Sequence, residues 1–302
     1  MPSDTYATAP PEWHWLVIVY FFFGGIAGGS YALAALIHLF GAPEDRPLAR
    51  LGYYVALPAV LACAPLLILD LNRPERFWHM VIQSERFLPM FKWWSPMSVG
   101  SWALMLFGAF AFLSFLAALA EDGRLPIRGF RALHQGVFGK LFVAIGAAFA
   151  FFLASYTGVL LSVTNRPIWA DTNLLGLLFL LSGASTAAAL MILLAGRRQG
   201  VPSPGLRSLY RFDDWVMLLE LVVLVVLVIS LGAVATAWLN AWGLLLLIGV
   251  VLVGILVPLL LHHRHFLGGL SVPAASILVL IGGFILRAVV VLSSEAIRHG
   301  VG

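Results

Sequence analysis

Eight long apolar stretches, each sufficient to cross a lipid bilayer as a helix, dominate this sequence of 302 residues. A membrane-spanning helix needs about 20 consecutive, predominantly apolar residues. Stretches of that kind lie at 14–39, 51–71, 96–120, 139–164, 173–195, 212–236, 241–262 and 271–294. A membrane β-barrel would instead show short segments in which apolar and polar residues alternate. The sequence therefore predicts an all-α integral membrane protein with eight transmembrane helices.

The composition limits which prosthetic groups the protein can hold. Hydrophobic residues make up 61% of the chain and charged residues only 11%, whereas soluble domains carry roughly a quarter charged residues. The one cysteine, Cys63, lies within an apolar stretch, which excludes disulfide frameworks, structural zinc and cysteine-held iron–sulfur clusters. None of the eight histidines falls in the middle of a predicted span, where a haem between facing helices would need them. We expect no metal site, no haem and no iron–sulfur cluster on this chain.

Lysine and arginine are distributed unevenly between the two sides of the predicted bundle. Most of them follow the first, third, fifth and seventh spans. Such loops face the cytoplasm in membrane proteins, so both termini are expected on the outer, periplasmic side. The same asymmetry accounts for the net charge of +4 without nucleic-acid binding.

Small residues cluster at matching depths in the first and fifth spans, at 24–29 and 182–187. Small side chains allow helix backbones to approach closely, and their repetition indicates a duplicated unit. We expect a single domain, 1–302, built from two four-helix bundles at 14–164 and 173–294. The alternative is that small residues are simply common in membrane helices.

Polar residues gather at the predicted outer ends of the first five spans. They are His14, Tyr20, Asp70, Tyr156, Thr157, Arg166, Trp169 and Asp171. Aromatic rings beside a phenol, an imidazole and a carboxylate suit a quinone, whose head packs on rings and whose carbonyls and protons need polar partners. His14, Asp70, Tyr156, Thr157 and Trp169 are the candidate binding residues. The alternatives are separate interfacial anchors and, for Asp70, an ion pair in the following loop.

A second polar set lies toward the predicted inner side. Glu220 follows Asp213 by two helical turns on nearly the same face, which places it about 10 Å deeper in the membrane. Arg287 lies within the eighth span, too far along for a direct pair with Glu220, so a polar file with water between them is expected. Charges at such depth usually mark a proton or ion path. The alternative is a purely structural contact between helices.

The loop 72–95 combines charges with aromatic rings. Its candidate docking residues for a partner protein are Arg73, Glu75, Arg76, His79 and Trp93. An interfacial aromatic belt would account for part of this composition.

Four segments resemble the signatures of the NrfD/PsrC family, the membrane subunits of polysulfide-reductase-type respiratory complexes. They are "LDLNRPERFWHM" at Leu69 to Met80, "WSPMSVGSW" at Trp94 to Trp102, "YTGVLL" at Tyr156 to Leu161, and "GGFILRAVVV" at Gly282 to Val291. The resemblance extends over essentially all eight spans.

This resemblance implies a quinone-reactive membrane anchor of a respiratory oxidoreductase in the bacterial cytoplasmic (inner) membrane. Tyr156 would donate a hydrogen bond to a carbonyl of menaquinone or ubiquinone, with His14 as a further partner. The loop 72–95 would receive a ferredoxin-like [4Fe–4S] subunit, which would link this chain to a molybdopterin catalytic subunit. Protons could come from the cytoplasmic side.

A secondary transporter or ion-translocating protein without quinone chemistry is the alternative function. Transporters are also built from repeats and carry charges near the midplane, but they usually interrupt helices at corresponding positions. The prolines inside the predicted spans, Pro58, Pro65, Pro258 and Pro273, do not form such matched interruptions.

Overall fold

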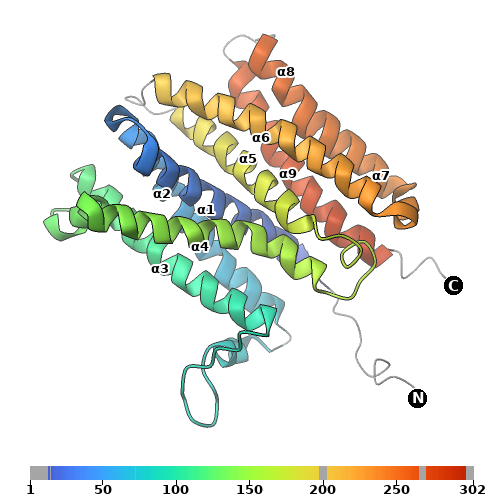
Figure 1. The fold of residues 1–302 in the computed structure, drawn as a ribbon, viewed down its shortest axis with the longest axis horizontal. Coiled ribbons are helices and arrows are strands. Elements are labelled where there is room, and N and C mark those ends of the chain that lie inside the picture. The colour runs from blue at the N-terminus through green and yellow to red at the C-terminus, as the bar shows by residue number, and fades with distance from the viewer. Residues whose placement is uncertain (1–12, 14, 72, 197–202, 265–269, 297–302) are drawn as a thin grey trace.

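The computed structural model describes residue 13 and residues 15–71, 73–196, 203–264 and 270–296. These residues are almost entirely helical (Figure 1). No β-strand occurs in the described ranges, where one isolated bridge joins Ile82 to Pro89. The prediction of an all-α fold is confirmed.

The long helices follow the apolar stretches of the sequence. They are α1 (Trp15–Phe40), α2 (Arg46–Asp70), α3 (Pro96–Glu121), α4 (Gly136–Ser162), α5 (Leu175–Ala195), α6 (Ser203–Ser230) and α9 (Ser271–Ala296). Between α6 and α9, α7 (Ala241–Leu245), the π-helix η6 (Leu246–Leu256) and α8 (Val257–Arg264) run on from one another. Short 3₁₀ helices are η2 (Pro43–Asp45), η3 (Pro74–Met80), η4 (Arg128–His134) and η5 (Gly232–Trp238).

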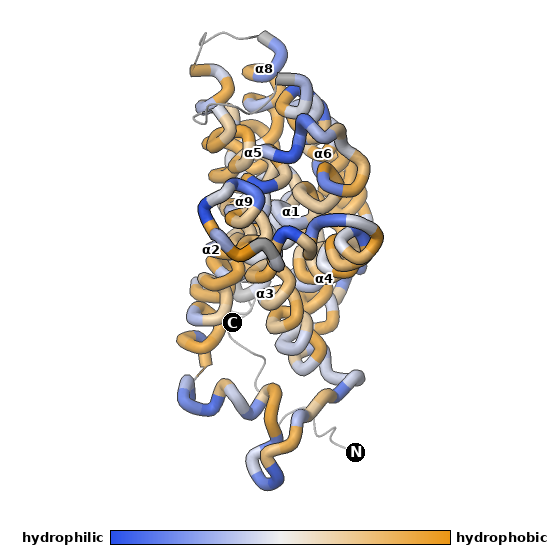
Figure 2. Tube along the Cα trace, turned by 90° about the vertical axis from the view of Figure 1, so that its left-hand side faces the viewer, coloured by the Kyte–Doolittle hydropathy of each residue, from blue (hydrophilic) through white to orange (hydrophobic). Residues whose placement is uncertain are grey.

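Seven helices in the described ranges are long and apolar enough to cross a membrane, and an eighth is added if α6 and η5 count as one span. Figure 2 shows hydrophobic residues along the helices and hydrophilic residues gathered at their ends and connections. This is the build of a multi-pass membrane protein. The inside and outside assignment of the termini remains a prediction from the distribution of lysine and arginine.

The sixth span differs from its predicted bounds of 212–236. Its helix begins earlier, at Ser203, and ends at Ser230, after which η5 turns away by 110°. Gly232 lies at this turn with a φ of 53°, a left-handed conformation that glycine adopts without a steric penalty. Residues 231–236 are mostly apolar, as the predicted span required, but they do not extend the straight helix α6.

Helices α1 and α5 occupy the centre of the fold. Figure 1 shows them side by side, with α3 and α4 beyond one flank and α6, α7 and α8 beyond the other. Helix α1 packs on α2, α4 and α5, while α5 packs also on α4, α6 and α9. We retain the two bundles, 14–164 and 173–294, as a proposal in which α1 and α5 hold equivalent positions.

The small residues of the first and fifth spans meet each other directly. A Cβ atom on Gly29 would lie 2.5 Å from the carbonyl oxygen of Gly183 and 2.7 Å from the Cβ of Ala187. A Cβ atom on Gly25 would lie 3.3 Å from the Cα of Gly183. The two backbones are therefore in contact, as small residues at a helix crossing permit.

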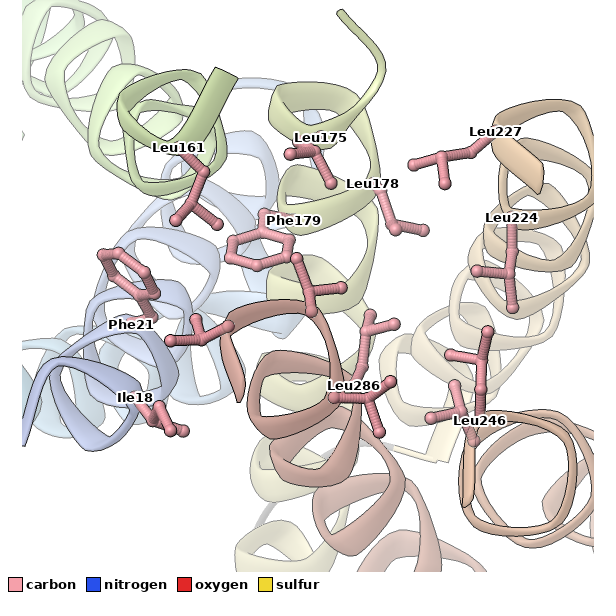
Figure 3. Packing of buried hydrophobic residues seen from close by; sticks show 14 of the residues in the cluster. Ile18, Phe21, Leu161, Leu175, Leu178, Phe179, Leu224, Leu227, Leu246 and Leu286 are labelled. Carbon is pink, nitrogen blue, oxygen red and sulfur yellow. The ribbon is translucent and has the colours of Figure 1, made fainter. Parts of the chain in front are cut away.

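Apolar side chains fill the space on either side of this crossing. Phe21 of α1, Leu161 of α4, Phe179 of α5 and Leu286 of α9 are fully buried and converge in one cluster (Figure 3). The cluster joins helices from the two halves of the sequence. It fixes the position of the central helices relative to α4 and α9.

The α1–α5 crossing generates a stability prediction. Gly29→Ala should lower the midpoint of thermal unfolding of the purified full-length protein, because the new methyl group meets backbone atoms of α5; such overpacking costs about 1–3 kcal/mol. Gly108→Ala is the matched control, since nothing lies within 4 Å of a Cβ atom at that position. Equal midpoints for the two variants would contradict the close crossing.

Candidate functional site

A cavity of ≈ 440 Å³ opens between α1, α2, α3 and α4, at the end of the bundle that carries the 72–95 segment. Aliphatic and aromatic side chains form most of its wall. Its polar or sulfur-bearing lining residues are Tyr20, Asp70, Met80, Met97, Ser101, Met105 and Tyr156. A predominantly apolar cavity with a few polar groups is the usual form of a site for a small organic molecule.

Tyr156 enters this wall from α4, close to the start of α3. A Cβ atom on Gly100 would collide with the Tyr156 ring and hydroxyl, so Gly100 provides the room in which the ring lies. The Tyr156 hydroxyl donates to the carbonyl oxygen of Pro96 at 2.6 Å. Its one hydrogen is therefore engaged, while its oxygen can still accept a hydrogen bond.

Tyr20, from α1, is the second phenol at the cavity. It was among the polar residues of the outer ends in the sequence, but nothing there distinguished it as a binding residue. No hydrogen bond joins its hydroxyl to another residue in the described part of the protein. Tyr20 therefore offers the cavity an unused donor, which Tyr156 does not.

Only some of the predicted quinone-binding residues line this cavity. Asp70 lines the same cavity as Tyr156. Thr157 is fully buried and donates to Ala154 O at 3.4 Å, and it does not line the cavity. Trp169 lies behind the wall, with its ring 5.3 Å from that of Trp13. His14 lies outside the described residues.

The indole nitrogen of Trp169 donates to Val290 O at 2.7 Å, which ties the segment after α4 to α9. Ser294 donates to Pro167 O at 2.8 Å in the same region. These bonds place Trp169 in the packing that supports the cavity. The sequence could not show this, because both acceptors are backbone groups distant along the chain.

Some residues of the 72–95 segment line the cavity and others are exposed at the surface. Phe77 and Met80 of η3 line the cavity, while the predicted docking residues Arg73, Glu75 and Arg76 of the same turn are exposed. His79 is partly buried with its ring against Trp78 at 3.9 Å, and Trp93 is 75% exposed. Further exposed apolar side chains in this segment are Phe87, Leu88, Phe91 and Trp94. The segment projects from the end of the bundle in Figure 1.

A line of buried polar groups runs between α5, α6 and α9 on the other side of α1. Ser185 donates to Asp213 Oδ1 at 2.8 Å, and both side chains are buried. Deeper in the bundle, the buried carboxyl of Glu220 interacts with the Ser182 hydroxyl. Ser182 and Ser185 are both from the small-residue stretch of α5.

Arg287 continues this line from α9. Its guanidinium is completely buried and donates to Ser182 Oγ at 3.2 Å, to Gly283 O at 2.6 Å and to Phe21 O at 3.1 Å. The rings of Phe22 and Phe179 lie 5.8 and 5.4 Å from its central carbon. Ser182 thus lies between Arg287 and Glu220.

The space beside Glu220 is narrow. Ser182, Thr186, Glu220, Gly254 and Gly283 surround a gap that admits no water-sized sphere. The Ser182 hydroxyl bridges the guanidinium of Arg287 and the carboxyl of Glu220. The water expected between these two groups from the sequence stays a prediction. The π-helix η6 forms one wall of the gap.

Comparison with known proteins identifies the family. The family described as "Polysulphide reductase, NrfD" matches residues 5–297. This chain belongs to the NrfD family. Its relatives include one of the chains of the polysulfide reductase of Wolinella succinogenes, which is 28% identical over 83% of this chain and 82% of that protein. An NrfD homologue of Haemophilus influenzae is 27% identical over 91% of this chain and 92% of that protein. One of the subunits of the selenate reductase of Mesobacillus selenatarsenatis is similar over a shorter region, 24% identical over 33% of this chain and 21% of that protein.

Membership of the NrfD family confirms the resemblance seen in the sequence. The match covers nearly the whole of this NrfD protein, so the cavity and the polar line both lie inside the shared region. Two of the relatives are named as components of reductases. A membrane subunit of a respiratory oxidoreductase is the function class that this kinship suggests.

The arrangement around Arg287 generates a second stability prediction. Arg287→Gln should destabilise the full-length NrfD protein in detergent by about 3 kcal/mol, because the buried oxygens of Ser182, Gly283 and Phe21 lose a charged donor and the buried Glu220 carboxyl loses the favourable charge of Arg287. Adding Glu220→Gln should recover part of the loss, since the unpaired charge is removed. Arg211→Gln, at an exposed position of α6, is the control. Unfolding of Arg287→Gln at the wild-type midpoint would contradict this role.

Proposed function

We propose that this NrfD protein is the quinone-reactive membrane subunit of a respiratory oxidoreductase. The observation that carries the proposal is the apolar cavity bounded by Tyr20, Asp70 and Tyr156, next to a surface segment rich in exposed aromatic and charged residues. A quinone head needs flat apolar walls, hydrogen-bond partners for two oxygens and a route for two protons. The cavity offers apolar walls, the hydroxyls of Tyr20 and Tyr156 as hydrogen-bond partners, and the Asp70 carboxyl as a group that can exchange protons.

The two phenols suit different redox states of the ligand. Tyr20 has an unused hydroxyl hydrogen and can donate to a quinone carbonyl, whereas Tyr156 presents an acceptor oxygen that suits the hydroxyl of a quinol. To donate to a quinone carbonyl, Tyr156 must first release Pro96 O. The Asp70 carboxyl at the same wall is the titratable group that can exchange a proton with the bound molecule.

The segment that lines the cavity also supports the proposed partner. Because η3 places Phe77 at the cavity and Arg73, Glu75 and Arg76 at the surface, a protein docked there would lie close to the bound quinone. We propose a ferredoxin-like [4Fe–4S] subunit as this partner, joined in turn to a molybdopterin catalytic subunit. The reductases to which two relatives belong support a multi-subunit assembly. We propose menaquinone or ubiquinone as the ligand, since both carry a flat head with two carbonyl oxygens.

The polar line offers a route for protons toward this cavity. It begins with the Asp213 carboxyl, continues through Ser185, Glu220 and Ser182, and reaches Arg287. Arg287 donates to the carbonyl of Phe21, and the Phe21 side chain lines the quinone cavity. With the outer side assigned to the cavity by charge distribution, the line would lead from the cytoplasmic side of the bacterial inner membrane.

An ion-translocating protein without quinone chemistry is the second candidate. The observation in its favour is the π-helix η6, which interrupts regular α-helical geometry beside the Glu220 gap. Such interruptions frequently accompany functional sites. In that case the Glu220 region would be the central site, and the phenols of the cavity would have no effect on activity.

Substitution of the phenols tests the quinone site. Tyr20→Phe should weaken binding of the quinol analogue 2-heptyl-4-hydroxyquinoline N-oxide by about 3–10-fold, because one hydrogen bond contributes about 0.5–1.5 kcal/mol while the ring remains. Tyr156→Phe should slow quinone turnover, while the variant subunit should still assemble into its complex. Binding is measured by fluorescence quenching with the purified protein.

Tyr54→Phe is the matched control for both substitutions. It also removes one phenol hydroxyl, which bonds Asp122 at 2.8 Å, away from the cavity lining. Unchanged binding and turnover in both Tyr20→Phe and Tyr156→Phe would refute the quinone site.

Glu220→Gln tests the proton route. Glutamine keeps the size and hydrogen-bonding capacity of the side chain but cannot titrate. In liposomes containing the complete complex, the variant should bind the inhibitor normally and generate a weaker membrane potential per electron transferred. Glu44→Gln, at an exposed position of η2, should behave as wild type. A normal potential in Glu220→Gln would make the polar line structural.

A further inference from the structure

A second cavity, of ≈ 490 Å³, lies at the opposite end of the first four helices from Tyr156. Helices α1 and α3 end there, α2 and α4 begin there, and η4 closes one side. Its lining residues are His38, Arg46, Arg50, Glu121, Arg131, His134, Gln135, Gly136 and Lys140. Nothing in the proposed quinone function uses this cavity.

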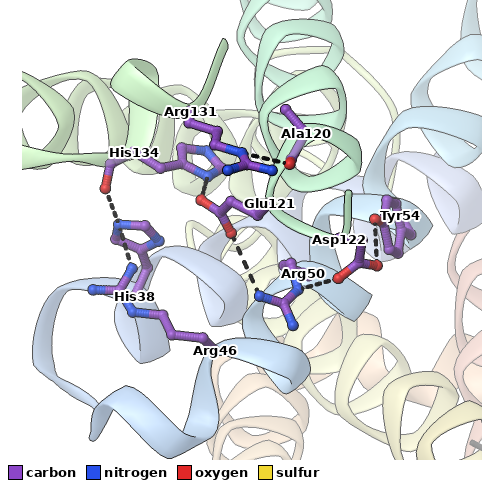
Figure 4. Close-up of polar contacts among 9 residues, drawn as sticks. All are labelled: His38, Arg46, Arg50, Tyr54, Ala120, Glu121, Asp122, Arg131 and His134. Carbon is purple, nitrogen blue, oxygen red and sulfur yellow. Dashed lines mark hydrogen bonds and ion pairs between the residues drawn. The ribbon is translucent and has the colours of Figure 1, made fainter. Parts of the chain in front are cut away.

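The acidic side chains near this cavity already have cations. Arg50 pairs with Asp122 at 2.6 Å and lies 3.8 Å from Glu121. Glu121 also contacts His134 Nδ1 at 2.9 Å. Figure 4 shows these contacts among the polar residues at this end of the helices.

Three further cations at the cavity pair with no carboxylate in the described ranges. Arg46 Nη1 contacts His38 Nε2 at 2.6 Å, and Arg131 donates to the Ala120 carbonyl at 2.7 Å (Figure 4). Lys140 is exposed on the first turns of α4. Positive charge therefore exceeds negative charge around the cavity.

The start of α4 adds to this positive character. Helix α4 begins at the cavity wall, at Gly136, with no side-chain cap and no acidic residue in its first turn, so backbone N–H groups at the start of a 27-residue helix lie at the cavity wall. An anion gains hydrogen bonds at such a helix start. His134, whose side chain is completely buried at the same wall, has an Nε2 atom without a hydrogen-bond partner among the described residues.

The surroundings favour a lipid as the source of the anion. Val137, Phe138 and Leu141, on the first turns of α4 beside Lys140, are 86%, 65% and 58% exposed. These side chains offer an apolar surface for acyl chains next to the charged cavity. Basic cavities between membrane helices at the interface are typical sites for acidic headgroups.

We propose that this cavity binds the phosphate of an anionic phospholipid, with the acyl chains along the exposed face of α4. Arg46, Arg131 and Lys140 neutralise the phosphate, and the start of α4 donates backbone hydrogen bonds to it. Bound there, the headgroup joins the ends of α1 and α3 to the starts of α2 and α4. The proposal is independent of the proposed quinone function.

The test uses the purified full-length protein in phosphatidylcholine vesicles that contain spin-labelled phosphatidylglycerol or spin-labelled phosphatidylcholine. The relative association constant for the two labels is measured from the motionally restricted signal. The wild type should prefer phosphatidylglycerol. Lys140→Gln and Arg46→Gln should each lower the preference about five-fold, since one basic side chain near an anionic lipid contributes on the order of 1 kcal/mol.

Arg124→Gln is the matched control. It removes one arginine from the same loop region, but at an exposed position that does not line the cavity, and it should leave the preference unchanged. Wild-type preference in both Lys140→Gln and Arg46→Gln would overturn the proposal. An equal loss in Arg124→Gln would also overturn it, because diffuse surface charge would then explain the selectivity.

A measurement on the wild type alone distinguishes a lipid from a soluble anion. Inorganic phosphate added at the same concentration as the labelled lipid should not displace phosphatidylglycerol. Complete displacement would show that the cavity takes a free phosphate and would overturn the lipid assignment. Lys140 is exposed, so its substitution also reports on the site if Arg46→Gln fails to fold.

Discussion

Direct backbone contact between α1 and α5 is the constraint on which the rest of this structure depends. Glycine at positions 25, 29 and 183 removes the side chains that would hold the two helices apart. The guanidinium of Arg287 then reaches across from α9 to the Phe21 carbonyl of α1 and the Ser182 hydroxyl of α5. Three helices from the two halves of the sequence are thereby joined at one buried point.

This junction separates two environments with different chemistry. On one side of α1 lies a predominantly apolar cavity with two phenols and a carboxyl at its wall. On the other side lies the buried line of Asp213, Glu220 and their serine partners. Phe21 belongs to both, because it lines the cavity and its carbonyl accepts from Arg287. The two environments therefore meet at a single residue.

The kinship with components of polysulfide and selenate reductases supports a multi-subunit assembly, and in our proposal the 72–95 segment receives the partner. One short 3₁₀ turn, η3, lines the cavity with Phe77 and Met80 and exposes Arg73 and Arg76. In our proposal, a partner bound to the exposed residues of this segment lies close to the cavity, so electrons have only a short distance to cross. The opposite end of the same bundle carries the basic cavity, so the two ends of α1 to α4 differ in both charge and proposed ligand.

The sequence by itself determined the helical class, the positions of most spans and the family, because spans require long apolar runs and the family motifs are continuous in the sequence. It also identified Asp70 and Tyr156, which share a cavity wall. It missed the turn after Ser230, since apolar composition does not distinguish a straight helix from a bent one. Only the tertiary structure decided that Tyr20 offers an unused hydroxyl and that Thr157 and Trp169 do not line the cavity. The physical reason is that the direction and partners of a side chain depend on neighbouring helices, whose rotation and crossing distance are set by packing between residues far apart in sequence.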